Sequence, residues 1–232
     1  MTGGNGVAVV TGAARNLGRS IALALARSGY DVVVNTRSDV AAAESVAAEA
    51  RVLGVRAVVA QADVTAPDQV ERMFAAADEL GPLKVLVNNA ATRTRVPVYE
   101  VSAADWEAVR SVTLDGAMNC VIAALPRLRQ GGGSVVSVIG GNALRGDAGR
   151  FHVSAAKHGL VGMTKALAAG CAADGINVNA VSPSRMEPAP GTSGAEGEAE
   201  RRRDTVADAV AFLCSPAGRD ITGQLIEVGT QR

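Results

Sequence analysis

The sequence predicts a single α/β domain in which helices cover both faces of a parallel sheet. Short β-branched runs alternate with longer segments of helical apolar period along almost the whole chain. The first β-branched run leads into a glycine turn and then a helix, an order typical of a doubly wound sheet. A length of 232 residues suits one such domain with a full core.

Turn residues divide the chain into the expected elements. Strands are expected at residues 6–11, 32–35, 57–61, 85–88, 134–139, 176–181 and 225–228. Helices are expected at residues 17–28, 41–53, 67–80, 103–129, 153–173 and 204–213.

Residues 185–203 break this alternation. They are rich in Pro, Gly, Glu and Ala, lack an apolar period and follow a strand end, where doubly wound sheets bind ligands. We therefore expect a substrate lid at 185–203, within a single domain that spans residues 1–232.

Composition and charge argue against several classes of function. Basic and acidic residues number 23 each, so the formal net charge is +0 and predicts neither a nucleic-acid nor a membrane partner. No N-terminal leader and no apolar run of membrane-spanning length is evident, so we expect a cytoplasmic protein. Cys120, Cys171 and Cys214 are expected to be small buried hydrophobes, and no metal site is predicted.

A glycine loop, TGAARNLG at residues 11–18, follows the first strand. Gly12 and Gly18 allow a tight turn and a close approach to a pyrophosphate, whose charge the amides at a helix N-terminus bind. Asn16 stands where the middle glycine is usual, and asparagine tolerates left-handed backbone better than most residues. The loop therefore predicts a dinucleotide site.

The end of the second strand indicates which dinucleotide is bound. An NAD site usually has an acid there for the ribose hydroxyls, whereas Asn35 is neutral. Arg37, together with Arg15 from the glycine loop, can flank a 2′-phosphate through charge-assisted hydrogen bonds. NADP(H) is therefore favoured, and NAD(H) is not excluded.

Further motifs resemble the short-chain dehydrogenase/reductase family, in the layout of bacterial 3-oxoacyl-carrier-protein reductases. The matching pieces, which span essentially the whole chain, are Thr11-Gly12 to Gly18, Asp63-Val64, Asn88-Asn89-Ala90, Lys157, Ser182-Pro183 and Ile221-Thr222-Gly223-Gln224. The resemblance implies a seven-stranded Rossmann sheet, a nicotinamide cofactor, a small-molecule substrate and a homodimer or homotetramer.

The resemblance also assigns cofactor contacts by position. It implies that Asp63 and Val64 contact the adenine and that Asn89 and Ala90 line the ribose. It further implies that Lys157 binds the nicotinamide ribose and that the nicotinamide is contacted by Pro183, Ser184 and Met186. Leu17 completes the phosphate loop with Arg15 and Asn16.

The family's catalytic side chains are largely missing. By position, Thr113 replaces the Asn, Gly140 the Ser and Val153 the Tyr, and Lys157 alone remains. Ser154 lies near the Lys157 face of a helix but is a poor acid. His152 has a suitable pKa, although its spacing of five residues turns it away from that face. Asn142, just past Gly140, is a loop candidate for contacting a carbonyl oxygen.

Three functions remain open on these residues. The first is a ketoreductase in which an aromatic polyketide protonates its own alkoxide through a neighbouring hydroxyl, as the missing tyrosine and serine leave room for a large planar substrate. This pattern resembles the atypical ketoreductases of actinomycete antibiotic pathways. The second is a dinucleotide-binding pseudoenzyme that acts as a sensor or scaffold, and the third is a 3-oxoacyl-type reductase that uses His152. We favour the first because a lid, together with a site that lacks the tyrosine and serine side chains, predicts a substrate pocket.

Overall fold

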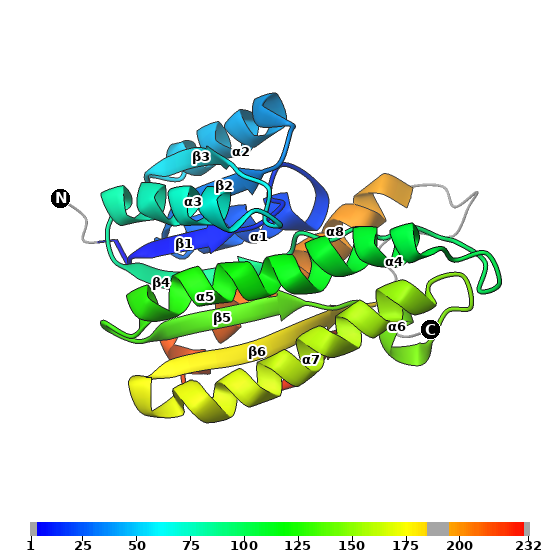
Figure 1. The fold of residues 1–232 in the computed structure, drawn as a ribbon. Helices are drawn as coiled ribbons and strands as arrows, with labels where there is room; N and C mark the ends of the chain where they lie inside the picture. The colour runs from blue at the N-terminus through cyan, green and yellow to red at the C-terminus, as the bar shows by residue number, and fades with distance from the viewer. Residues whose placement is uncertain (1–3, 185–194, 230–232) are drawn as a thin grey trace.

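The computed structural model describes residues 4–184 and 195–229. All strands of its seven-stranded sheet are parallel, in the order β3-β2-β1-β4-β5-β6-β7 (Figure 1), which confirms the predicted fold class. The strands are β1 (Val7–Val10), β2 (Asp31–Thr36), β3 (Ala57–Gln61), β4 (Leu83–Asn88), β5 (Gly133–Val138), β6 (Ile176–Pro183) and β7 (Leu225–Val228).

Helices pack on both faces of the sheet. One face carries α1 (Asn16–Arg27), α2 (Val40–Val52) and α8 (Ala195–Leu213), and the other carries α3 (Pro67–Leu80), α5 (Gly116–Leu128) and α7 (Phe151–Cys171). Shorter helical segments are α4 (Ala103–Arg110), α6 (Gly141–Arg145) and the 3₁₀ turns Ala172–Asp174 and Pro216–Gly218.

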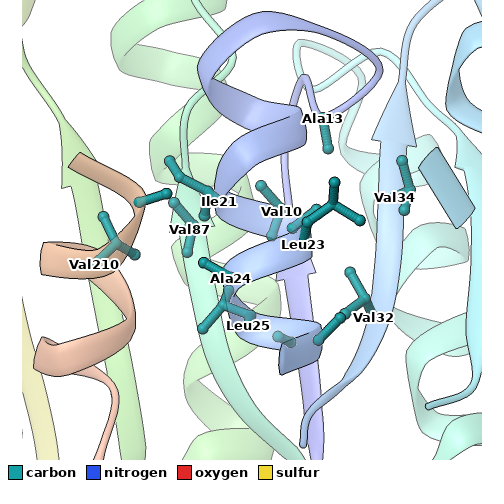
Figure 2. Packing of buried hydrophobic residues seen from close by; sticks show 14 of the residues in the cluster. Val10, Ala13, Ile21, Leu23, Ala24, Leu25, Val32, Val34, Val87 and Val210 are labelled. Atoms are coloured by element: carbon teal, nitrogen blue, oxygen red, sulfur yellow. The ribbon is translucent and has the colours of Figure 1, made fainter. Parts of the chain in front are cut away.

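The core explains why the strands are apolar on both sides. Every residue of β1 is buried, because alternate side chains face opposite helical layers. Val10 packs beneath Ile21 and Leu25 of α1 on one face, and Figure 2 shows Val210 of α8 joining this cluster. On the other face, Phe74 of α3 lies in a separate cluster with further strand side chains. Burial of this apolar area is the main favourable contribution to folding.

The strand order places a crevice at the carboxyl ends of β1 and β4. The chain moves outward from β1 to β2 and β3, then returns to β4 on the other side of β1, so the loops after β1 and β4 diverge. Ligands bind at such a topological switch point in open α/β sheets. The Thr11 hydroxyl bridges the two loops, because it accepts hydrogen bonds from the backbone N–H groups of Asn89 (2.9 Å) and Ala90 (3.0 Å).

Two expected elements differ in the structure. The helix expected at 103–129 is interrupted by a π-helical segment, Ser111–Asp115, between α4 and α5. Close packing accompanies this widened turn: a Cβ on Gly116 would lie 2.5 Å from Val64 Cγ2.

The helix expected at 204–213 begins earlier, because residues 195–203 of the expected lid form the first turns of α8. Acidic Glu196 and Glu198 complement the helix N-terminus, and Glu198 pairs with Arg202 one turn later, so the segment is helical without an apolar period. The rest of the expected lid, 185–194, lies outside the described residues.

One helical stretch has the composition of a membrane span. Ala103–Leu128 is long and apolar enough to cross a membrane, and it alone is so among residues 4–184 and 195–229. Its buried side chains, including Cys120, Ala124 and Leu128, pack in the core against the sheet. Part of its hydropathy therefore reflects packing in this layer, while Met118 and Ile122 are exposed.

Candidate active site

A cavity of about 790 Å³ opens at the carboxyl edge of the sheet. It brings together most of the predicted site residues. Those that line it are Gly12, Arg15, Asn16, Leu17, Gly18, Asn35, Arg37, Asp63, Val64, Asn89, Ala90, Gly140, Val153, Lys157, Pro183 and Ser184. Thr113 and His152 do not line it.

The glycine loop has the geometry that a pyrophosphate requires. Gly12 has φ 60° and Asn16 has φ 49°, so the asparagine adopts the left-handed conformation expected of it. A Cβ on Gly18 would overlap the Gly12 carbonyl oxygen and lie 2.6 Å from Asn89 Nδ2. No side chain caps the N-terminus of α1, so its first N–H groups are open to ligand oxygens. The loop therefore fits a dinucleotide.

Two side-chain amides hold this loop against the sheet. Asn35 Oδ1 accepts a hydrogen bond from the Gly12 N–H (3.1 Å), and Asn35 Nδ2 donates to the carbonyls of Ala60 and Ala62. Asn89 Nδ2 donates to the carbonyls of Thr11 (2.9 Å) and Gly12 (3.0 Å). The amides of Asn35 and Asn89 are thus engaged within the protein, which corrects the expectation that Asn35 is simply a neutral residue of the ribose site.

The far end of the cavity combines basic and acidic groups. Arg15 is 72% exposed and lies 3.9 Å from the Asp39 carboxylate, while Arg37 is exposed. Asp63 Oδ1 accepts hydrogen bonds from the Thr65 N–H and hydroxyl, which orient its carboxylate within the wall. Both arginines are therefore free to turn toward a phosphate, since neither is held in a buried network.

The positions expected to match the family's Asn, Ser and Tyr present no acid to the cavity. Thr113 is fully buried and exchanges long hydrogen bonds with the backbone of Thr92. Val153 is 5% exposed and packs on Val109 and Ala156. Gly140 has φ 136°, and no atom lies within 4 Å of a Cβ built on it. The cavity is open at Gly140, although the backbone there disfavours any side chain.

Lys157 is the one member of the expected catalytic set that this chain keeps. It is 3% exposed, lines the cavity, and its Nζ donates to the Val138 carbonyl at 2.6 Å. Burial, with a smaller contribution from the positive charge of Arg93, lowers the pKa of Lys157 from 10.5 to about 7. Burial therefore disfavours the charged ammonium of Lys157 relative to the neutral amine.

The candidate replacement acids have different surroundings. His152 is 1% exposed, and its Nε2 lies 2.9 Å from the Thr94 hydroxyl, so it links α7 to the loop after β4. This agrees with the expectation that it points away from the Lys157 face. Ser154 lines the cavity, and its buried hydroxyl has no hydrogen-bond partner among the described residues. Asn142 lies in α6 rather than in a loop, and its side chain is outside the described part.

The predicted nicotinamide contacts follow β6. Pro183 ends that strand, and the backbone N–H of Ser184 donates to the Val228 carbonyl at 2.8 Å. Met186 falls outside the described residues.

The sequence reasoning missed several charged residues of the cavity, among them Arg93, Arg95, Asp147, Arg150 and Arg203. Arg150 carries a usable signal, because it directly precedes the helix that carries Lys157. Arg93 and Arg203 come from a loop and from the helix that was expected to be a lid, so no periodicity marks them.

Comparisons with known proteins identify the family. The family model described as short chain dehydrogenase matches residues 6–198. The 3-oxoacyl-(acyl-carrier-protein) reductase FabG of Staphylococcus aureus is 36% identical over 235 residues, which cover 95% of each chain. This chain belongs to the short-chain dehydrogenase family.

Solved structures support the same assignment. A short-chain alcohol dehydrogenase from Sinorhizobium meliloti superimposes with a TM-score of 0.87 at 33% identity, covering 97% of this chain and 94% of the other. An acetoin dehydrogenase from Salmonella typhimurium gives a TM-score of 0.87 at 29% identity, covering 96% and 94%. Family and relatives together confirm an NAD(P)H-dependent oxidoreductase that acts on a ketone or alcohol.

The lowered pKa of Lys157 predicts a pH-dependent stability. Between about pH 7 and 10.5 the unfolded chain keeps the Lys157 proton that the folded chain releases, so the free energy of unfolding should rise with pH, by up to about 1.4 kcal/mol per unit. Lys157→Met should remove this component. Urea denaturation of the cofactor-free protein from pH 7 to 9.5 measures it.

The matched control is Lys165→Met, which removes an exposed lysine from the same helix. It should keep the wild-type slope. Equal slopes for wild type and Lys157→Met would show that Lys157 is not a buried, deprotonating group.

Proposed function

We propose that this protein is an NADPH-dependent ketoreductase that reduces a ring ketone of an angucyclinone-type aromatic polyketide to a secondary alcohol in antibiotic biosynthesis. One observation carries the proposal. The dinucleotide cradle is intact, whereas the wall opposite it has Val153 and Gly140 at the tyrosine and serine positions and open space beside Gly140. A flat, rigid ligand can use that space.

The chain's own residues suit the cofactor. The α1 N-terminus and the glycine loop would hold the pyrophosphate, and Arg15 and Arg37 a 2′-phosphate. Asp63 and Val64 would bound the adenine side, and Ala90, Pro183 and Ser184 the nicotinamide half. NADP(H) is our choice because β2 ends in the neutral Asn35 and Thr36 and is followed directly by the exposed Arg37.

In the proposed reaction the protein orients the substrate and the cofactor, and the substrate donates the proton. The reduced nicotinamide supplies the hydride when bound. In its protonated form, Lys157 would stabilise the negative charge that develops on the carbonyl oxygen. Val153 and Gly140 offer no O–H group, so a phenol or enol hydroxyl already hydrogen-bonded to the ketone would protonate the alkoxide.

His152 is the weaker alternative as an acid. It lies behind the cavity wall, bonded to Thr94, and would have to leave that contact to reach a substrate. The combined loss of tyrosine and serine resembles the atypical angucyclinone ketoreductases, such as that of simocyclinone biosynthesis, and this resemblance supports the choice of substrate class.

We also propose a cytoplasmic homodimer or homotetramer. The side chains of Trp106 on α4 and of Met118 and Ile122 on α5 are large, apolar and exposed, and a second copy would bury them.

The substrate proposal predicts a preference between ketones. With NADPH, an aromatic ketone bearing an adjacent hydroxyl should be reduced at least a hundredfold more efficiently in kcat/KM than a simple β-ketoacyl ester, because only the first brings its own acid; a general acid contributes roughly 10²–10⁴-fold. Oxidation of NADPH at 340 nm, with product identification, measures this. Faster reduction of the ester, or no reduction of any aromatic ketone, would contradict it.

The cofactor proposal predicts a selective loss of affinity. Replacing Arg15 and Arg37 together by Ala should weaken NADPH binding by about 1.5–3 kcal/mol for each charge-assisted hydrogen bond that is removed, and should leave NADH nearly unchanged. Titration calorimetry compares the two cofactors. Arg72→Ala, a remote and exposed arginine paired with Asp68, is the control. Equal losses for NADPH and NADH would refute recognition of the 2′-phosphate.

A further inference from the structure

The cavity wall around Lys157 holds more positive than negative charge. Arg93, after β4, and Arg150, before α7, line the cavity together with Lys157. The nearby acid, Asp147, is already paired with Arg95 at 3.1 Å. Arg93 and Arg150 make no ion pair with any described residue. This part of the wall therefore lacks a counter-charge.

One face of α7 supplies unused hydrogen-bond donors to the same place. Ser154 and Lys157 are three residues apart on one side of the helix, and Arg150, which directly precedes the helix, lines the cavity with them. Arg150 Nε and Ser154 Oγ are buried, and neither has a hydrogen-bond partner within the described chain. Because buried polar atoms in folded proteins are nearly always hydrogen-bonded, these two point to an acceptor on a ligand.

The electrostatics of Lys157 support an anion at this position. Arg93 is close enough to lower the pKa of Lys157, so positive potential is already felt inside the cavity. A bound anion would offset that repulsion and favour the protonated ammonium.

The phosphates of the dinucleotide do not account for these groups. The glycine loop with Arg15 follows β1, and Arg37 follows β2. Arg93 follows β4 and Arg150 precedes α7, so both belong to the other side of the cavity, next to Val153. Arg150 and Val153 are three residues apart on the wall that the proposed function gives to the substrate.

We propose that the substrate of this enzyme carries an anionic oxygen group, a carboxylate or a phosphate, that is bound by Arg93, Arg150 and Ser154. The inference rests on the proposed function, because it adds a property to the substrate of the same site. Guanidinium groups bind such oxygens in a bidentate manner, and the Ser154 hydroxyl can donate a further hydrogen bond to the same group. The anion would anchor one end of the flat ring system and so fix which ketone faces the hydride donor.

Binding to the protein saturated with NADP⁺ tests this without catalysis. The probes are 2-naphthoate, the neutral 2-naphthamide and 2-naphthyl phosphate, measured by titration calorimetry. An anion should bind at least tenfold more tightly than the amide. Arg150→Gln and Arg93→Gln should each weaken anion binding roughly ten- to hundredfold and leave the amide unchanged, while Arg72→Gln should change neither.

The two anions distinguish the source of the group. Tighter binding of naphthoate indicates a carboxylate on the substrate itself, and tighter binding of naphthyl phosphate indicates a phosphorylated carrier arm. Equal affinity for the anions and the amide, no binding of either anion, or unchanged binding in both arginine variants would overturn the inference.

Two further measurements protect the test from misfolding, since Arg150 also precedes the first turn of α7. Ser154→Ala should weaken anion binding without altering the helix. The protein should also take up a proton near pH 7 when the anion binds, because Lys157 becomes protonated. Calorimetry detects this uptake as a binding enthalpy that varies with the ionisation enthalpy of the buffer. Wild-type anion affinity in Ser154→Ala together with no proton uptake would refute the site.

Failure of this inference can be told apart from failure of the proposed function. Arginine-dependent anion binding without reduction of any ketone would refute the ketoreductase proposal alone. Reduction of hydroxylated aromatic ketones by a protein that does not discriminate acid from amide would refute the anion site alone.

Discussion

The site depends on how the glycine loop is held against the carboxyl ends of β1 and β4. Gly18 is so close to the Gly12 carbonyl and the Asn89 amide that a Cβ cannot be placed there. Asn35, Asn89 and Thr11 then satisfy backbone groups of the two loops with side-chain hydrogen bonds. The loop is thereby shaped before any ligand arrives, so less conformational entropy is lost on binding.

That preorganised half contrasts with the opposite wall. There the structure has Val153 in an apolar cluster, Gly140 with a backbone that disfavours a side chain, and Thr113 turned to the Thr92 backbone. Returning a serine to position 140 would strain the backbone, so the departure from the family pattern involves the loop as well as the side chains. Lys157 remains, and its buried amino group is bonded to the Val138 carbonyl, beside a wall without a hydroxyl acid at those positions.

The sequence predicted the sheet well, and the residues it assigned to the cofactor line one cavity, because both features depend on local rules. Continuous apolar runs mark strands covered on both faces, and Gly12 and Gly18 mark a backbone that must turn and approach closely. Residues 195–203 were misjudged because their helix depends on first-turn acids and the Glu198–Arg202 pair rather than on apolar period. The internal use of the Asn35 amide could not be foreseen, since its partners Ala60 and Ala62 are distant in sequence. Arg93 and Arg150 likewise come together only when the loop after β4 packs near the start of α7, so the sequence did not mark them as one group.

The central claim is that the substrate supplies the proton that the family's tyrosine would give. The most direct measurement compares one hydroxylated aromatic ketone with its methyl ether, using NADPH turnover and calorimetric binding on the same protein. The account predicts that methylation lowers kcat by at least a hundredfold while Kd changes little, because the missing hydrogen bond acts mainly in the transition state. Undiminished turnover of the methyl ether would contradict it and show that the protein holds an acid of its own.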